Sequence, residues 1–139
     1  CIRDRIEWII KTELLEPIKP LLNAGMIFEA IVLMLNNISA NSVFYKKALK
    51  LEGAVTFNQI AMKCVYEMFM NIINEKSTGK KSKYRWLTPE VISTYYAQSL
   101  CFITEGWIAQ GMDDIEPKEM AEAYMYLITR SMDDILSEL

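Results

Sequence analysis

The segment from Thr88 to Gln110 constrains the fold more than any other part of this chain. Placed on a helix of about 3.6 residues per turn, it carries apolar side chains on almost every side. A helix on the surface of a globular domain needs only one apolar stripe, about a third of its circumference wide. We therefore expect this segment to be covered nearly all round and to form the centre around which the other elements pack.

Length and composition favour one well-packed domain. A chain of 139 residues is long enough to bury a proper hydrophobic core. Its apolar fraction of 52% lies slightly above the usual share, and its charged fraction of 24% is ordinary. No apolar run reaches the roughly 18 residues that a bilayer span needs, and the mixed charges at the start do not fit a signal peptide. We expect a soluble, cytoplasmic protein without a membrane partner.

The charged and reactive residues argue against several functions. The net charge of −3 does not fit a domain that grips nucleic acid by itself. The chain has no histidine, which removes the commonest general base and the commonest transition-metal ligand. Its three cysteines lie far apart, so neither a zinc site nor a disulfide framework is expected. We expect no enzyme, no metal and no cofactor.

Two acidic clusters remain to be weighed against that expectation. Asp113, Asp114 and Glu116 form one, and Asp133 with Asp134 forms the other. They superficially resemble the clusters that bind magnesium in helical prenyl-transferring enzymes, where carboxylates from facing helices converge. A position before a helix start explains the first cluster, and a solvated helix face explains the second.

Apolar residues recur at helical spacing along the whole chain, and no alternating pattern predicts a strand. Thr56 with Gln59 has the capping-box pattern of a helix start, and Thr88 precedes a proline at the first helical position. Pro17 and Pro20 are expected to break regular structure or to start a new short turn. The expected helices are Ile2–Leu15, Met26–Ile38, Val43–Glu52, Thr56–Ile73, Thr88–Gln110 and Pro117–Leu136, with Gly53 and Gly111 as C-terminal caps.

We therefore predict an all-α domain spanning residues 1–139, an antiparallel bundle of about five to six helices. The hydrophilic stretch 75–85 between two of them contains five basic residues. A solvated loop explains it better than a nucleic-acid patch does, because a turn and solubility suffice. The five basic residues are Lys76, Lys80, Lys81, Lys83 and Arg85.

The interior is unusually rich in methionine and aromatic residues. Thioether side chains adapt to ligands of different shape, so these residues can line an apolar binding pocket. An ordinary hydrophobic core is the alternative. The candidate ligand-binding residues are Met34, Met62, Tyr66, Phe69, Tyr96 and Trp107.

The last two long helices carry more apolar surface than a small domain can cover. Ser99 and Gly106 form a ridge of small residues beside Tyr95 and Phe102, which allows close approach of another helix. Two such helices from each of two copies would form a four-helix interface with two-fold symmetry. A monomer that buries these faces internally is the alternative. The expected interface residues are Tyr95, Ser99, Phe102, Gly106, Met120, Tyr124, Ile128 and Ile135.

Several motifs in chain order resemble the TetR family of transcriptional regulators. Residues 44–53, FYKKALKLEG, followed by Thr56-Phe57, resemble the family's "FYRxxL…G…SF" pattern between two helices. Residues 95–97, 106–108 and 116–121 resemble its closing "YY…G…W…G…PEEMA" region.

The start of the chain fits the same family. Residues 2–5 resemble the point where the family's linking helix leaves the DNA-binding head. Ile2 departs from the family by replacing an aromatic residue. Cys101 and Phe102 stand where smaller residues are common, which leaves the shape of a pocket open.

The resemblance implies a bacterial, all-helical, ligand-sensing and dimerisation domain. In this family an effector in the core changes the spacing of two helix-turn-helix heads that bind operator DNA. We expect a homodimer, a small hydrophobic or aromatic effector, and operator DNA reached only through a head that this chain does not contain. A helical protein–protein interaction module without a small-molecule ligand is the alternative.

Overall fold

The computed structural model describes residues 1–139 except Ala54 and Lys80, and its regular structure is helical throughout the described residues. Lys80 of the expected basic stretch therefore lies outside the described residues. The all-α prediction is confirmed. The elements are α1 (Ile2–Ile9), the π-helix η1 (Ile10–Leu15), α2 (Glu16–Asn23), α3 (Ile27–Ala40), α4 (Ser42–Leu49), α5 (Phe57–Lys76), α6 (Pro89–Ala109), α7 (Pro117–Thr129) and α8 (Met132–Glu138).

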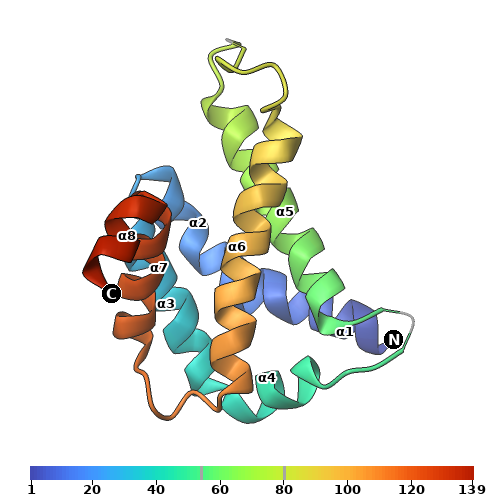
Figure 1. Ribbon diagram of the computed structural model, residues 1–139. Helices are drawn as coiled ribbons and strands as arrows, with labels where there is room; N and C mark the ends of the chain where they lie inside the picture. The colour runs from blue at the N-terminus through green and yellow to red at the C-terminus, as the bar shows by residue number, and fades with distance from the viewer. Residues whose placement is uncertain (54, 80) are drawn as a thin grey trace.

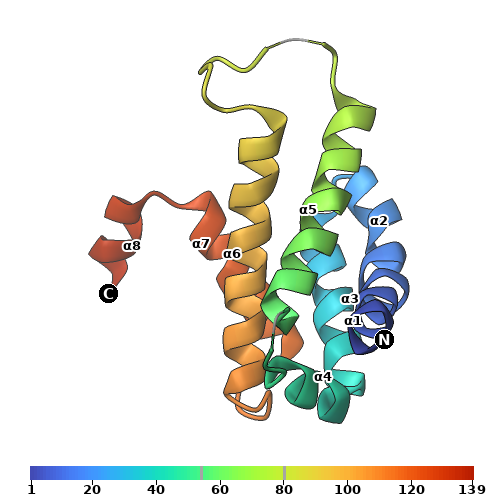
Figure 2. The ribbon, with the colours of Figure 1, turned by 90° about the vertical axis from the view of Figure 1, so that its right-hand side faces the viewer.

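The antiparallel pair of α5 and α6 forms the spine of the molecule (Figures 1 and 2). The other helices pack around its lower part, with η1 and α2 against α5, α4 across the base, and α3 behind α6. The upper ends of α5 and α6 project beyond this body and are joined at the top by the loop after α5. α7 packs mainly on α3 and less on α6, and α8 lies outside α7.

Several helix ends follow directly from local sequence. The capping box predicted at α5 is present: the Gln59 N–H donates to Thr56 Oγ1 over 3.3 Å, and the Thr56 N–H donates to Gln59 Oε1 over 2.8 Å. Gly111 follows α6 at a φ of +98°, as expected for a C-terminal cap. The expected cap at Gly53 is wrong, because α4 already ends at Leu49 with Lys50 as its cap.

The first helical segment is longer than the prolines predict. Helical structure runs from Ile2 through the π-helix η1 to Asn23, so Pro17 and Pro20 do not interrupt it. Pro17 falls in the first turn of α2, where a missing N–H costs least. The segment ends at Gly25, whose φ of +77° and whose N–H bond to the Leu22 carbonyl form part of a Schellman turn.

The last predicted helix is two helices. α7 ends at Thr129, Arg130 adopts an extended conformation, and α8 begins at Met132. The hydroxyl of Ser131 caps α8 by accepting the Asp134 N–H over 3.1 Å. The single helix Pro117–Leu136 is therefore wrong, and Ser131 is the local signal that marks the break.

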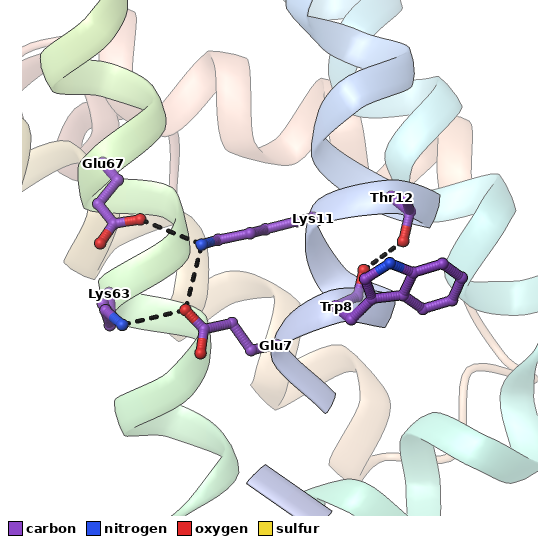
Figure 3. A network of polar contacts seen from close by, with 6 residues as sticks. All are labelled: Glu7, Trp8, Lys11, Thr12, Lys63 and Glu67. Atoms are coloured by element: carbon purple, nitrogen blue, oxygen red, sulfur yellow. Dashed lines mark hydrogen bonds and ion pairs between the residues drawn. The ribbon is translucent and has the colours of Figure 1, made fainter. Parts of the chain in front are cut away.

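A network of charged side chains joins the first helical segment to α5 (Figure 3). The Glu7 carboxylate lies 3.0 Å from Lys63 Nζ and 3.1 Å from Lys11 Nζ, and Lys11 Nζ also lies 3.5 Å from Glu67. These two hydrogen-bonded lysines lower the pKa of Glu7. The network therefore fixes α1 and η1 against the spine.

In the part of the chain that the structure describes, no helix alone has both the length and the apolar character to cross a bilayer. α3 and α4 meet such a test only as a pair, and they are bent by 89° where they join.

Candidate functional site

A small cavity lies in the core where η1, α3, α5 and α6 meet. Its volume is about 30 Å³, and its wall is almost entirely apolar. That is the space of about one water molecule, and far less than the about 150 Å³ of an apolar cavity that admits benzene. The lining residues are Ile10, Leu14, Leu15, Met34, Ile38, Phe57, Ala61, Val65, Leu100, Cys101, Thr104 and Glu105.

Two adjacent residues of α6, Thr104 and Glu105, give this cavity a polar side. Thr104 is only 9% exposed, and its Oγ1 has no hydrogen-bond partner among the described residues. Burial raises the pKa of the Glu105 carboxyl, and the Asn58 amide donates to Glu105 Oε2 over 2.6 Å. A buried hydroxyl without a partner is uncommon, because it costs free energy. The cavity therefore presents an apolar wall with two polar groups at one side.

The π-helix supplies one wall of the cavity. Three of its six residues, Ile10, Leu14 and Leu15, are buried and face the cavity. Single wide turns of this kind occur frequently at functional sites. The side-chain amide of Asn37 on α3 donates to the Glu13 carbonyl over 3.1 Å and fixes the same wall from outside the helix.

The structure does not gather the six predicted ligand-binding residues around one cavity. Met34 lines the core cavity. Trp107 is buried, but its indole Nε1–H donates to the Ile115 carbonyl over 2.8 Å and ties α6 to the loop before α7. The remaining four, Met62, Tyr66, Phe69 and Tyr96, lie outside the cavity lining.

A group of aromatic residues that is largely exposed occupies another side of the α5–α6 pair. The rings of Phe69 and Tyr96 are 6.4 Å apart in an edge-on arrangement, and Tyr95 lies 5.2 Å from Tyr96 in the same way. Tyr96 also lines an open groove beside the upper part of α6. The helical spacing of these residues places them on the apolar half of their helices. Spacing alone does not say which residues of that half line the core cavity and which lie at the surface.

One face of α6 is exposed over its middle. Tyr95 is 64% and Phe102 70% exposed, and Gly106 on the same face is open to solvent. A Cβ added at Gly106 would meet no atom within 4 Å. This helix is therefore not covered on all sides within one chain, and the uncovered side carries three residues of the predicted interface.

The other predicted interface residues are less accessible. The Ser99 hydroxyl lies 2.7 Å from the Tyr124 hydroxyl, so these side chains join α6 to α7 inside the chain. Tyr124 is 3% exposed, and burial raises its pKa. We therefore remove Tyr124 from the expected interface. Met120, Ile128 and Ile135 are half-buried. Leu127, Met132 and Leu136 on α7 and α8 are also exposed, although helical phase did not place them in the expected interface.

Comparison with known proteins gives one family. The sequence profile of the family described as "Transcriptional regulator C-terminal region" (TetR_C_8) matches residues 26–130. No curated protein and no solved structure matches the chain. The matched region begins just before α3 and ends just after α7, so it contains most of the cavity wall and the exposed face of α6. Because the match covers well over half of its length, this chain belongs to the TetR-family C-terminal domains of transcriptional regulators.

Proposed function

We propose that this chain is the ligand-sensing and homodimerisation domain of a TetR-like regulator. A small hydrophobic or aromatic effector binds in the core cavity and alters operator binding by a helix-turn-helix head carried elsewhere in the protein. One observation carries the proposal: α6 lines the cavity with Leu100, Cys101 and Thr104 and exposes Tyr95 and Phe102 on another side. A single rigid helix therefore belongs to both the cavity and the uncovered face.

The size of the cavity defines how an effector acts. About 30 Å³ is too small for an aromatic ring, so an effector binds only to a conformation in which the cavity is wider. A ligand shifts an equilibrium by its difference in affinity for the two conformations. Widening moves α6 relative to η1, α3 or α5, and any movement of α6 also moves the uncovered face. Thr104 and Glu105 give the effector a polar contact at one end of the cavity.

The dimer is tested by the mass of the particle in solution. We expect light scattering of the wild-type chain at micromolar concentration to give two chain masses. Gly106→Leu should give one chain mass, because the new side chain blocks close helix approach. The structure has open space at Gly106, so the variant should keep its fold and helicity. A wild-type monomer would contradict dimerisation, and an unchanged dimer in the variant would remove Ser99 and Gly106 from the interface.

The ligand is tested by thermal shift against a panel of hydrophobic and aromatic cations, anions and neutral compounds. A compound that binds only the folded state raises the melting temperature. Val65→Ile adds one methylene to the cavity wall and should weaken any stabilising compound while leaving the dimer intact. Asn36→Ala, an exposed change on α3 outside the cavity lining, is the control. Absence of a stabiliser in a broad panel would favour an interaction module without a ligand.

A further inference from the structure

The projecting end of the α5–α6 pair, which we call the arm, has an apolar and basic surface that the core does not use. An open groove of about 500 Å³ runs beside α6 and is lined by Trp86, Leu87, Val91, Thr94, Tyr95 and Gln98 among others. Trp86 is 75% exposed. A second groove of about 920 Å³ continues from it across Leu87 and Ile92.

The charge of the arm is positive. Lys76, Lys81 and Arg85 line the second groove, and Lys83 lies over the ring of Tyr84 at 5.6 Å. The ion pairs formed by the described residues join Lys11, Lys19 and Lys63 to glutamates, so none of them neutralises these arm cations. The arm therefore combines exposed aromatic surface with unneutralised positive charge.

The short helix α8 has the complementary character. Met132 is 76% exposed, and Leu136 is exposed one turn later on the same side. Asp133 and Asp134 lie in the first turn and form no ion pair with a described residue. Helix-dipole stabilisation accounts for acidic residues at this position, but not for the apolar row beside them. Ile135 is only half-exposed, so α8 turns one apolar side inward and one outward.

Within one chain these two surfaces do not meet. No described residue of α8 lines either groove, and α8 lies beside α7, away from the arm (Figures 1 and 2). α7 runs back along α6 for 13 residues, which is at most about 20 Å. That length brings its end no higher than about Tyr96, one end of the groove. A second copy is therefore needed to bring α8 into the groove.

The orientation of the two copies follows from the proposed function, on which this inference rests. Two heads that read one operator must leave the dimer at the same end. The chain starts away from the arm, towards the opposite end of the molecule (Figure 1). A two-fold axis roughly parallel to α6 puts both chain starts at one end and both arms at the other. Rotation about this axis leaves the position of α8 along α6 unchanged, so α8 of each copy lies beside the lower part of the partner's groove.

We infer that α8 of one copy docks in the arm groove of a second copy, reciprocally, as an addition to the interface formed by α6 and α7. Met132 and Leu136 cover the apolar floor beside Tyr95, while Asp133 and Asp134, at the upper end of α8, face the basic tip. Isologous contacts of this kind form twice in a two-fold dimer. Opposite charges at the rim of an interface set specificity and orientation more than affinity.

Charge reversal tests the pairing. Asp133→Lys with Asp134→Lys should weaken the dimer about tenfold, and Lys81→Glu with Lys83→Glu should do the same, because each turns attraction into repulsion. All four changes together should restore dimer affinity, and the wild-type affinity should fall with added salt. Sedimentation measures the dimer, and circular dichroism checks that each variant remains helical. Loss of dimer affinity in the arm variant without rescue would mean that the arm contacts a part of the second copy other than α8 and would overturn the inference.

Disulfide trapping tests the geometry. In a Cys1→Ser background, Thr94→Cys with Leu136→Cys should give a band of two chain masses under mild oxidation. Either cysteine alone should give little of it. The matched pair Gln110→Cys with Leu136→Cys, at the other end of α6, should not crosslink. A crosslink within one chain, or preference for the Gln110 pair, would overturn the inference. If the wild type is a dimer but the Thr94 crosslink does not form, only the docking of α8 is overturned. If the wild type is a monomer, the proposed dimerisation is overturned as well.

Discussion

The side-chain amide of Asn37 donates to the main-chain carbonyl of Glu13 over 3.1 Å. In an uninterrupted α-helix the N–H of residue 17 would donate to that carbonyl, but Pro17 has no N–H. Asn37 therefore supplies from α3 a side-chain donor to a carbonyl next to the proline, where the π-helix η1 passes into α2. This bond helps that segment to continue past its proline, and it fixes the wall of the cavity formed by η1.

Replacement of Asn37 should measure this bond. Asn37→Ala leaves a partly buried carbonyl without its side-chain donor, and we expect the free energy of unfolding to fall by about 1–2 kcal/mol. Asn36→Ala is the matched control, because Asn36 is exposed on the same helix. Urea denaturation followed by circular dichroism measures both. Equal effects of the two changes would show that the Asn37 bond contributes nothing particular.

The second prediction concerns the stability effect of the Thr104 hydroxyl, which has no hydrogen-bond partner among the described residues. Thr104→Val keeps the shape of the side chain and removes a buried polar group, so the free energy of unfolding should rise by about 1 kcal/mol. Thr94→Val serves as the control, because the Thr94 hydroxyl is exposed and donates to the Glu90 carbonyl over 2.8 Å. It should change stability by less than about 0.5 kcal/mol. A less stable Thr104→Val protein would mean that the hydroxyl has a partner in solution.

The existence of the helices could be predicted from the sequence, because periodicity and caps are local properties. Thr56 with Gln59 and Thr88 with Pro89 define helix starts that the structure reproduces within one residue. The helical path through Pro17 could not be predicted in this way, since the Glu13 carbonyl beside it is bonded by Asn37, which lies 24 residues after Glu13 in the chain. The break at Arg130 has a local signal in the Ser131 cap, but the apolar period continues across it.

The site was harder to predict than the fold. Phase alone places Ala61, Val65, Met62 and Tyr66 together on the apolar half of α5. In the structure Ala61 and Val65 line the cavity, whereas Met62 and Tyr66 do not. The difference depends on which neighbours cover each side, and those come from η1, α3 and α6. The exposed face of α6 was easier, because Tyr95, Phe102 and Gly106 share one side by spacing alone.

Because of the charged network at Glu7, we expect the free energy of unfolding to depend on pH in the acid range. Hydrogen bonds from Lys63 and Lys11 lower the folded-state pKa of Glu7 below the ordinary value of a glutamate. A lowered folded pKa gives stability that is present above the unfolded pKa and is lost as the pH falls through the folded value. The contribution of Glu7 should therefore be complete at pH 7 and be lost progressively as the pH falls through the lowered pKa of Glu7.

Glu7→Gln tests this sign. At pH 7 the variant should be less stable than wild type by up to about 1 kcal/mol, the range of partly exposed ion pairs. The difference between the two proteins should shrink progressively as the pH falls and Glu7 of the wild type is protonated. Asp4→Asn, an exposed change on α1 outside the network, is the control for the amide substitution itself. A Glu7→Gln deficit that persists unchanged at pH 3 would assign the effect to packing instead of charge.

The three cysteines report on the opening of the cavity. Cys1 is exposed, whereas Cys64 and Cys101 are buried, and burial raises their pKa values to about 11 and about 12. Only the thiolate reacts with iodoacetamide. At pH 8 we therefore expect one rapid addition to the folded chain and three in urea, counted by intact mass. Cys101 lines the cavity, so its slow modification measures how often α6 opens locally. A compound that binds in the cavity should slow it without changing the rate at Cys1. Rapid modification of all three cysteines in the folded chain would contradict the burial of Cys64 and Cys101.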